Sequence, residues 1–208
     1  MPILSGILEN KIIAIIRGSK PEQVLSIANA LYEGGIKVLE ITMDSPKALH
    51  VIEEVSGKLG DKMLVGAGTV LDKETARAAL LAGAKFILSP TVDIETIKIT
   101  KRYGAVSIPG AFSPTEILQA YENGGDIIKV FPASTMGPGF ISDIHGPLPQ
   151  IPLLPTGGVD LTNIGAYIKA GAAGVGLGSA LVNPKVDVNE SSLQQLTIKA
   201  RRFVEEIH

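Results

Sequence analysis

The sequence IIKVFPAS, residues 127–134, places one ionisable amine inside a run of apolar and β-branched residues that is typical of a buried strand. Lys129 is poorly suited to a low dielectric, because burying an ammonium group costs free energy unless the group is paired. A buried lysine therefore tends to lose its proton and become a nucleophile at neutral pH. The alternative is a lysine at a strand end whose flexible stem reaches water.

Seven further runs of this kind recur roughly every 20 to 26 residues along the chain. Stretches with helical periodicity lie between them, and this alternation predicts parallel strands joined by helices. Eight strands are what a (β/α)8 TIM barrel requires, so we expect that fold, preceded by a short N-terminal helix. The predicted strands are Ile12–Ile16, Val38–Thr42, Met63–Val65, Phe86–Leu88, Val106–Ile108, Ile127–Phe131, Ile151–Leu154 and Val175–Leu177.

Turn residues repeat with the strands. A glycine followed by Gly or Ala precedes several strands, at the place expected for a left-handed helix C-cap. These pairs are Gly34-Gly35, Gly83-Ala84, Gly104-Ala105, Gly124-Gly125 and Gly171-Ala172. Helix starts follow the strands. We expect capping boxes at Ser19 to Glu22 and Ser113 to Glu116, and simpler N-caps at Ser45-Pro46, Asp72 and Asp160.

The repeated unit runs through the chain without a long linker or a break in composition, so residues 1–208 are predicted to form a single domain. The alternative is an open doubly wound sheet, which needs a glycine fingerprint directly after its first strand. Ile12 to Gly18 is followed instead by a helix start.

Composition excludes several functional classes. Apolar residues make up 45% and charged residues 19% of the chain, and the net charge of −2 with no basic run argues against nucleic acid and anionic membranes. There is no cysteine, hence no disulfide and no thiolate site. The N-terminal MPILSGILENK lacks the features of a secretory leader, and no segment has the apolar length of a membrane span. We expect a soluble cytoplasmic protein.

Two glycine-rich turns follow the seventh and eighth predicted strands, where this fold commonly holds a phosphate. PTGGVD, residues 155–160, contains Gly157 and Gly158, and LGSALV, residues 177–182, contains Gly178 and Ser179. Glycine lets backbone N–H groups approach an anion, and we expect them to do so at helix N-termini. Each turn alone is ordinary, but the pair predicts phosphate binding.

Strand alternation selects a partner for Lys129. Side chains two apart share a face, so Lys129 and Phe131 point one way, and in VLEIT the residues Val38, Glu40 and Thr42 do likewise. Glu40 is a carboxylate in an apolar strand; it forms a structural ion pair, lies outward at a strand end, or has a catalytic role. An amine and a carboxylate of raised pKa are the two groups that imine chemistry needs.

Further polar residues close other predicted strands. Arg17 ends the first strand, where its guanidinium can hold a carboxylate. Thr69 follows the third strand and Thr156 the seventh, although threonine at a strand end is commonly explained by β propensity or capping. The histidines, His50, His145 and His208, have no metal-ligand spacing, so no metal site is expected.

These segments resemble, in order and over nearly the whole chain, the strand-end motifs of the 2-keto-3-deoxy-6-phosphogluconate (KDPG) aldolase family. The matching motifs are VLEITMDSP, VGAGTVL, FILSP, IPGAFSPTE, IIKVFPAS, LLPTGGVD and GLGSALV. The family includes members that cleave 4-hydroxy-2-oxoglutarate (KHG) and a branch acting on the 6-phosphogalactonate analogue. Its members are class I aldolases of carbohydrate metabolism, in the Entner–Doudoroff pathway, on a (β/α)8 barrel that is typically trimeric.

The resemblance implies a role for each residue. Lys129 corresponds to the Schiff-base lysine and Glu40 to the general acid/base. Thr69 and Thr156 would line the pyruvate end of the substrate, and Phe131 is expected to be a further substrate-binding residue. Gly157, Gly158, Gly178 and Ser179 would surround the phosphate. The implied products are pyruvate and an aldehyde such as glyceraldehyde 3-phosphate, with no cofactor and with a homotrimer as the assembly.

One position departs from the family pattern. Many gluconate-branch members carry an arginine two residues after the threonine of the Glu-x-Thr motif, where it is thought to bind the substrate carboxylate. This chain has Asp44 there, followed by Ser45 and Pro46. We therefore expect Arg17 to bind the substrate carboxylate instead. The DSP turn, the Arg17-Gly18 pair and Ser134 to Pro138 resemble the galactonate branch, whereas SPTE and PTGG resemble the gluconate branch.

Two other functions are open at this point. An imine-free phosphosugar isomerase or epimerase would use carboxylates and keep Lys129 as a charge partner. A non-catalytic barrel that binds a phosphorylated metabolite would need neither group to react. Against both stands the placing of Lys129 and Glu40 within apolar strands, where keeping two ionisable groups is costly unless they are used.

Overall fold

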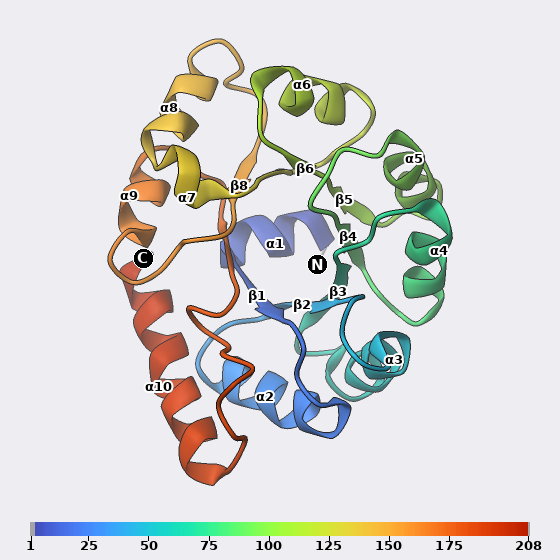
Figure 1. Cartoon of the computed structure of the whole chain (residues 1–208), viewed down its shortest axis with the longest axis vertical. Coiled ribbons are helices and arrows are strands. Elements are labelled where there is room, and N and C mark those ends of the chain that lie inside the picture. Colours follow the sequence, from blue (N-terminus) through green and yellow to red (C-terminus); the bar gives the residue numbers. More distant parts are fainter. Residues whose placement is uncertain (1–2, 208) are drawn as a thin grey trace.

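The computed structural model describes residues 3–207 and arranges parallel strands around a common interior, with helices outside them (Figure 1). The strands are β1 (Ile12–Ile16), β2 (Val38–Thr42), β3 (Leu64–Gly68), β4 (Phe86–Leu88), β5 (Val106–Ile108), β6 (Gly110–Ala111), β7 (Ile128–Val130), β8 (Leu153–Pro155) and β9 (Val175–Leu177). The helices are α1 (Ile3–Asn10), α2 (Pro21–Glu33), α3 (Ala48–Leu59), α4 (Lys73–Leu81), α5 (Ile94–Arg102), α6 (Pro114–Glu122), α7 (Ala133–Met136), α8 (Gly139–His145), α9 (Ile164–Lys169) and α10 (Glu190–Glu206).

The expected closed eight-stranded TIM barrel is wrong. The strands form a six-stranded parallel sheet in the order β5-β4-β3-β2-β1-β9 and a separate three-stranded parallel sheet, β6-β7-β8, which together make a partial (β/α) barrel. Pro109 separates β5 from β6, and proline has no N–H to continue a ladder. At the other seam, no ladder joins β8 to β9 within residues 3–207: an isolated bridge links Thr156 and Gly176, and the N–H of Ala173 donates to the Leu153 carbonyl.

The strand positions were largely predictable. β1, β2, β4, β5 and β9 have the predicted bounds, whereas β3, β7 and β8 are shifted. β3 runs on through its glycines because it pairs with β2 as far as Thr42 opposite Gly68. β6 was missed because two small residues carry no strand signal.

The order of the six-stranded sheet, apart from β9, follows the chain, which excludes the doubly wound alternative. Apolar side chains from several strands fill the interior and pack with Ile7 of α1, which lies across the end where the strands start (Figure 1). This small cluster contains Ile7, Ile13, Val38, Phe86, Leu88, Val106, Ile108, Ile127 and Leu154. The opposite end, where the strands finish, is left for polar residues.

Helix ends agree with the sequence in part. Asp72 caps α4, and Ser113 forms the expected capping box with Glu116 at α6. The other expected caps are wrong: α2 is preceded by Lys20 without a side-chain bond, α3 starts after Lys47 rather than at Ser45-Pro46, and Asp160 bonds Thr162 ahead of α9. The expected left-handed glycines are present at Gly35, Gly83, Gly104, Gly124 and Gly171.

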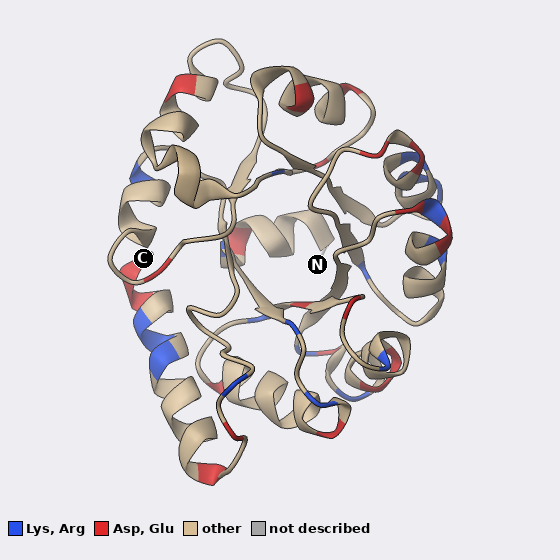
Figure 2. Cartoon of the chain, in the orientation of Figure 1, with Lys and Arg blue, Asp and Glu red and all other residues tan. Residues whose placement is uncertain are grey.

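Charged residues lie mainly on the outer helices, with both signs interspersed (Figure 2). Between residues 3 and 207, no helix is long and apolar enough to cross a membrane. The single domain over residues 1–208 stays a prediction.

We predict that Ser113→Ala lowers the free energy of unfolding by about 1 kcal/mol, because the mutation removes the acceptor for the Glu116 amide and half of the capping box. Denaturant titration followed by circular dichroism measures this. The matched control is Thr115→Ala, an exposed position in the first turn of the same helix. Equal stability of the two variants would contradict the capping role.

Candidate active site

Lys129 lies in the middle of β7 with only 3% of its surface exposed. It shares its strand face with Ile127, which belongs to the interior cluster, so the lysine points inward rather than out to solvent. Burial lowers the pKa of the Lys129 amine, which the charge of Glu40 partly offsets and that of Arg17 reinforces. The amine also lies 4.7 Å from the centre of the Phe131 ring. The alternative of a lysine reaching water at a strand end is wrong.

Glu40 lies in β2 and is 1% exposed, on the same face as Val38 of the interior cluster. Burial raises the pKa of this carboxyl, against the opposing positive charges of Lys129 and Arg17, and Asp44 raises it further. Among residues 3–207, neither Glu40 oxygen has a hydrogen-bond partner. Leaving a buried carboxyl without a partner is costly, which makes Glu40 a candidate functional residue.

Lys129 and Glu40 influence each other electrostatically, yet within the described residues no ion pair at 4 Å or less joins them. The structural ion pair considered from the sequence is therefore not formed. The two groups face a shared interior, and Lys129 also lines a cavity at the strand ends.

Gly68 creates the room for Glu40. A Cβ placed on Gly68 would overlap the Glu40 carboxylate, and one on Gly66 would overlap the Phe86 ring. Neither glycine has a positive φ, so space and not backbone conformation requires them. Nothing in the sequence indicates that the side chain next to Gly68 is Glu40.

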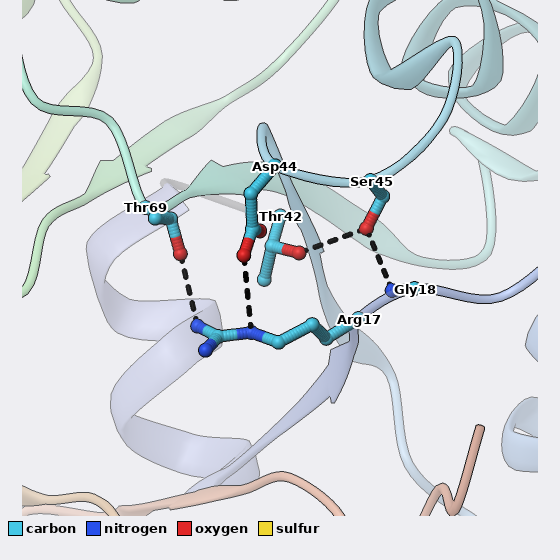
Figure 3. Close-up of polar contacts among 6 residues, drawn as sticks. All are labelled: Arg17, Gly18, Thr42, Asp44, Ser45 and Thr69. Carbon is cyan, nitrogen blue, oxygen red and sulfur yellow. Dashed lines mark hydrogen bonds and ion pairs between the residues drawn. The ribbon is translucent and has the colours of Figure 1, made fainter. Parts of the chain in front are cut away.

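Arg17 follows β1 and is held on one edge by residues after β2 and β3 (Figure 3). Its Nη2 donates a hydrogen bond of 3.0 Å to Thr69 Oγ1, and its Nε lies 3.8 Å from Asp44 Oδ2. The Arg17 side chain is still 56% exposed. Arg17 is therefore oriented while remaining open to a ligand.

A cavity of about 310 Å³ at the strand ends collects most of the predicted site residues. Its lining includes Arg17, Lys129, Phe131, Thr156, Gly157, Gly158, Gly178 and Ser179. Glu40 interacts electrostatically with Lys129 of this lining, and Thr69 accepts a hydrogen bond from Arg17 of the same lining. One strand-end site therefore unites residues that lie far apart in the sequence.

The glycine turns differ from expectation in one respect. Gly157 and Gly158 both have positive φ, which glycine adopts without strain. Neither turn is a helix N-terminus, however, because α9 starts only at Ile164 and the first helix after β9 starts at Glu190. The expected helix-dipole contribution is therefore wrong, and backbone approach alone remains.

Three further residues of this region, Ser134, Asp160 and Pro184, were not predicted to belong to the site. A Cβ on Gly158 would overlap Ser134, so the start of α7 packs against the glycine turn. Asp160 and Pro184 also line the cavity. Residues 3–207 contain no group of three or more His, Cys, Asp or Glu that could hold a metal, and His208 lies outside the described residues.

A second cavity, of about 360 Å³, lies beside α10 and has a mostly apolar lining that includes Ile27, Val182 and Leu196. It contains neither the buried amine nor the carboxylate. We assign the candidate active site to the cavity of Lys129, because a buried amine of lowered pKa meets a ligand-sized space there.

Residues 3–197 match the family described as KDPG and KHG aldolase. The chain is 36% identical to the 2-dehydro-3-deoxy-6-phosphogalactonate aldolase of Escherichia coli K12, covering 92% of this chain and 94% of that one. It is 33% identical to the 2-dehydro-3-deoxy-phosphogluconate aldolase of Pseudomonas aeruginosa, covering 95% and 89%.

A solved structure shows the same architecture. The KDPG aldolase of Legionella pneumophila, with pyruvate captured as a covalent carbinolamine intermediate, matches with a TM-score of 0.80 at 28% identity, covering 100% of this chain and 97% of that one.

We predict that Lys129 is carbamylated by cyanate at a lower pH than a short lysine peptide, because cyanate reacts with neutral amines and burial lowers the Lys129 pKa. Peptide mapping across a pH series measures the labelling rate. In Glu40→Gln the Lys129 pKa falls further, because the negative charge that favours the ammonium is lost. A Lys129 that titrates like the peptide contradicts the assignment.

Proposed function

Since the chain belongs to the KDPG and KHG aldolase family, we propose that it cleaves a 2-keto-3-deoxy-6-phospho sugar acid to pyruvate and glyceraldehyde 3-phosphate through a Schiff base on Lys129. Family membership makes the protein a carbon–carbon lyase. One observation carries the proposal: a buried amine of lowered pKa faces the same interior as a buried carboxyl of raised pKa with no hydrogen-bond partner within residues 3–207.

Imine formation is the first step. The neutral Lys129 amine attacks the C2 ketone, and proton transfers give a carbinolamine. Glu40 holds a proton readily because burial raises its pKa. It protonates the C2 hydroxyl, which leaves as water, and the nitrogen lone pair forms the iminium.

Carbon–carbon cleavage follows. Glu40, now a carboxylate, takes the proton of the C4 hydroxyl, directly or through a water. The C4 oxygen forms the aldehyde, the C3–C4 bond breaks, and its electron pair moves through C2 to the iminium nitrogen to give an enamine. Protonation at C3 and hydrolysis then release pyruvate and return the Lys129 amine. The imine is the electron sink, so this chemistry uses no metal or organic cofactor.

Substrate binding in this proposal uses residues around the same cavity. Arg17 binds the substrate carboxylate. It takes the role of the arginine that many gluconate-branch members carry at the position of Asp44. Thr69, Phe131 and Thr156 contact the pyruvate part, while Gly157, Gly158, Gly178 and Ser179 contact the phosphate through backbone N–H groups and the serine hydroxyl. A phosphate held far from the breaking bond supplies orientation.

The substrate class rests on relatives from both epimer branches, which match this chain at 36% and 33% identity. Assays should therefore offer the gluconate and galactonate epimers and 4-hydroxy-2-oxoglutarate in parallel. We also propose a cytoplasmic homotrimer with an Entner–Doudoroff-type role, supported by resemblance to the family. Light scattering coupled to size-exclusion chromatography gives the oligomeric mass.

We predict that Lys129→Ala abolishes pyruvate release, measured with a lactate dehydrogenase coupled assay, because the nucleophile is gone. The same change at Lys85, which is exposed, leaves the rate within about twofold of the native protein. Glu40→Gln reduces kcat by about 10²-fold or more, because it removes the proton relay. Near-normal pyruvate release by a correctly folded Lys129→Ala protein would refute the Schiff-base proposal.

We predict that Gly68→Ala lowers kcat by about tenfold or more, because the new methyl group displaces the Glu40 carboxylate. Gly57→Ala, in α3 with open space around the new Cβ, is the control and retains full activity. Steady-state kinetics and circular dichroism of both variants distinguish a displaced carboxylate from misfolding. Unchanged kcat in Gly68→Ala would mean that the position of Glu40 is unimportant.

A further inference from the structure

The contacts of Arg17 occupy one edge of its guanidinium and leave another edge unused. Nε faces Asp44 Oδ2 at 3.8 Å, and Nη2 donates to Thr69 Oγ1 at 3.0 Å, so both partners lie along the Nε–Nη2 edge (Figure 3). Within residues 3–207 the remaining nitrogen, Nη1, has no hydrogen-bond or ion-pair partner. A guanidinium held in this way still offers its Nη1–Nη2 edge to a planar carboxylate in bidentate fashion.

Hydrogen bonds join the turn that carries Asp44 to the residue after Arg17. The backbone N–H of Gly18 donates to Ser45 Oγ at 2.9 Å, and Ser45 Oγ lies 2.9 Å from the buried Thr42 Oγ1 (Figure 3). Gly18 has a φ of 68°, which a glycine adopts without steric cost. These bonds place Asp44 and Arg17 side by side before any ligand arrives.

Thr69 contributes a third observation. It has a φ of 55°, an unfavourable conformation for a β-branched residue that persists only where surrounding contacts enforce it. Its hydroxyl is the acceptor for Arg17 Nη2. β1, β2 and β3 are paired neighbours, so three consecutive strand ends converge on a single guanidinium.

We propose that Asp44 is a positioning residue that, with Thr69, holds Arg17 so that its free Nη1–Nη2 edge faces the substrate carboxylate. This rests on the proposed function. Asp44 thus has a use at the position where the family pattern places an arginine: it orients the cation supplied by the neighbouring strand.

The charge of Asp44 also has an effect that would weaken substrate binding. Asp44 is negatively charged and 48% exposed, so its charge also repels an approaching carboxylate. If repulsion dominated, removing the charge would tighten binding. If orientation dominates, removing the side chain weakens binding, because a long exposed arginine then loses its fixed geometry.

Steady-state kinetics with each epimer of the 2-keto-3-deoxy-6-phospho sugar acid separates the two effects. Asp44→Ala is expected to raise KM about tenfold while kcat stays within about threefold, because the reacting groups are untouched. Asp44→Asn, which keeps the shape and an acceptor oxygen, is expected to restore KM to within about threefold of the native value. Asp61→Ala, an exposed residue near the opposite ends of the strands, is the matched control and leaves KM unchanged.

An Arg17→Met background completes the test. If Asp44 acts through Arg17, then Asp44→Ala has no further effect on KM once Arg17 is replaced. A KM that falls in Asp44→Ala, does not change, or rises equally in both backgrounds overturns the positioning role. Absence of turnover in the native protein with every substrate overturns the proposed function and this inference together.

Discussion

Burial of the Lys129 amine opposite the Glu40 carboxyl is the constraint on which the rest of the site depends. Both side chains are almost fully enclosed, and burial moves their pKa values towards the neutral forms. A partial barrel makes this arrangement possible, because strands distant in sequence direct alternate side chains into one interior. Gly68 then leaves the space that the carboxyl occupies. In the proposed mechanism, the same burial that costs stability prepares the Lys129 amine to attack and the Glu40 carboxyl to supply protons.

The chemistry could be predicted further than the architecture. Lys129 and Glu40 were recognisable because ionisable residues within apolar strands are unusual, and strand parity alone placed them on inward faces. Arg17, Thr156 and the glycine turns reach the same cavity because strand ends share one rim. Most strands could be located for the same reason: β-branched runs between helical stretches have a strong local signal.

Closure of the sheet could not be predicted, because it depends on which backbone groups pair across the seams. Eight predicted strands had led us to expect a continuous ladder around the barrel. Instead, the ladder stops at Pro109, and between β8 and β9 it is reduced to an isolated bridge of Thr156 and Gly176. Side-chain contacts were equally invisible. Ser45 was expected to cap a helix, yet it binds Gly18 and Thr42, and Asp44 pairs with Arg17. The partners of these side chains come from segments that are distant in the sequence, so a local sequence pattern does not predict them.

The central claim is that Lys129 forms an imine with a keto acid. Its most direct test is intact-protein mass spectrometry after incubation with pyruvate and borohydride, followed by peptide mapping. The account predicts one stable adduct of reduced pyruvate per chain, located on Lys129 and absent when pyruvate is omitted. A folded protein that gives no adduct in excess pyruvate, or an adduct on another lysine, would contradict it.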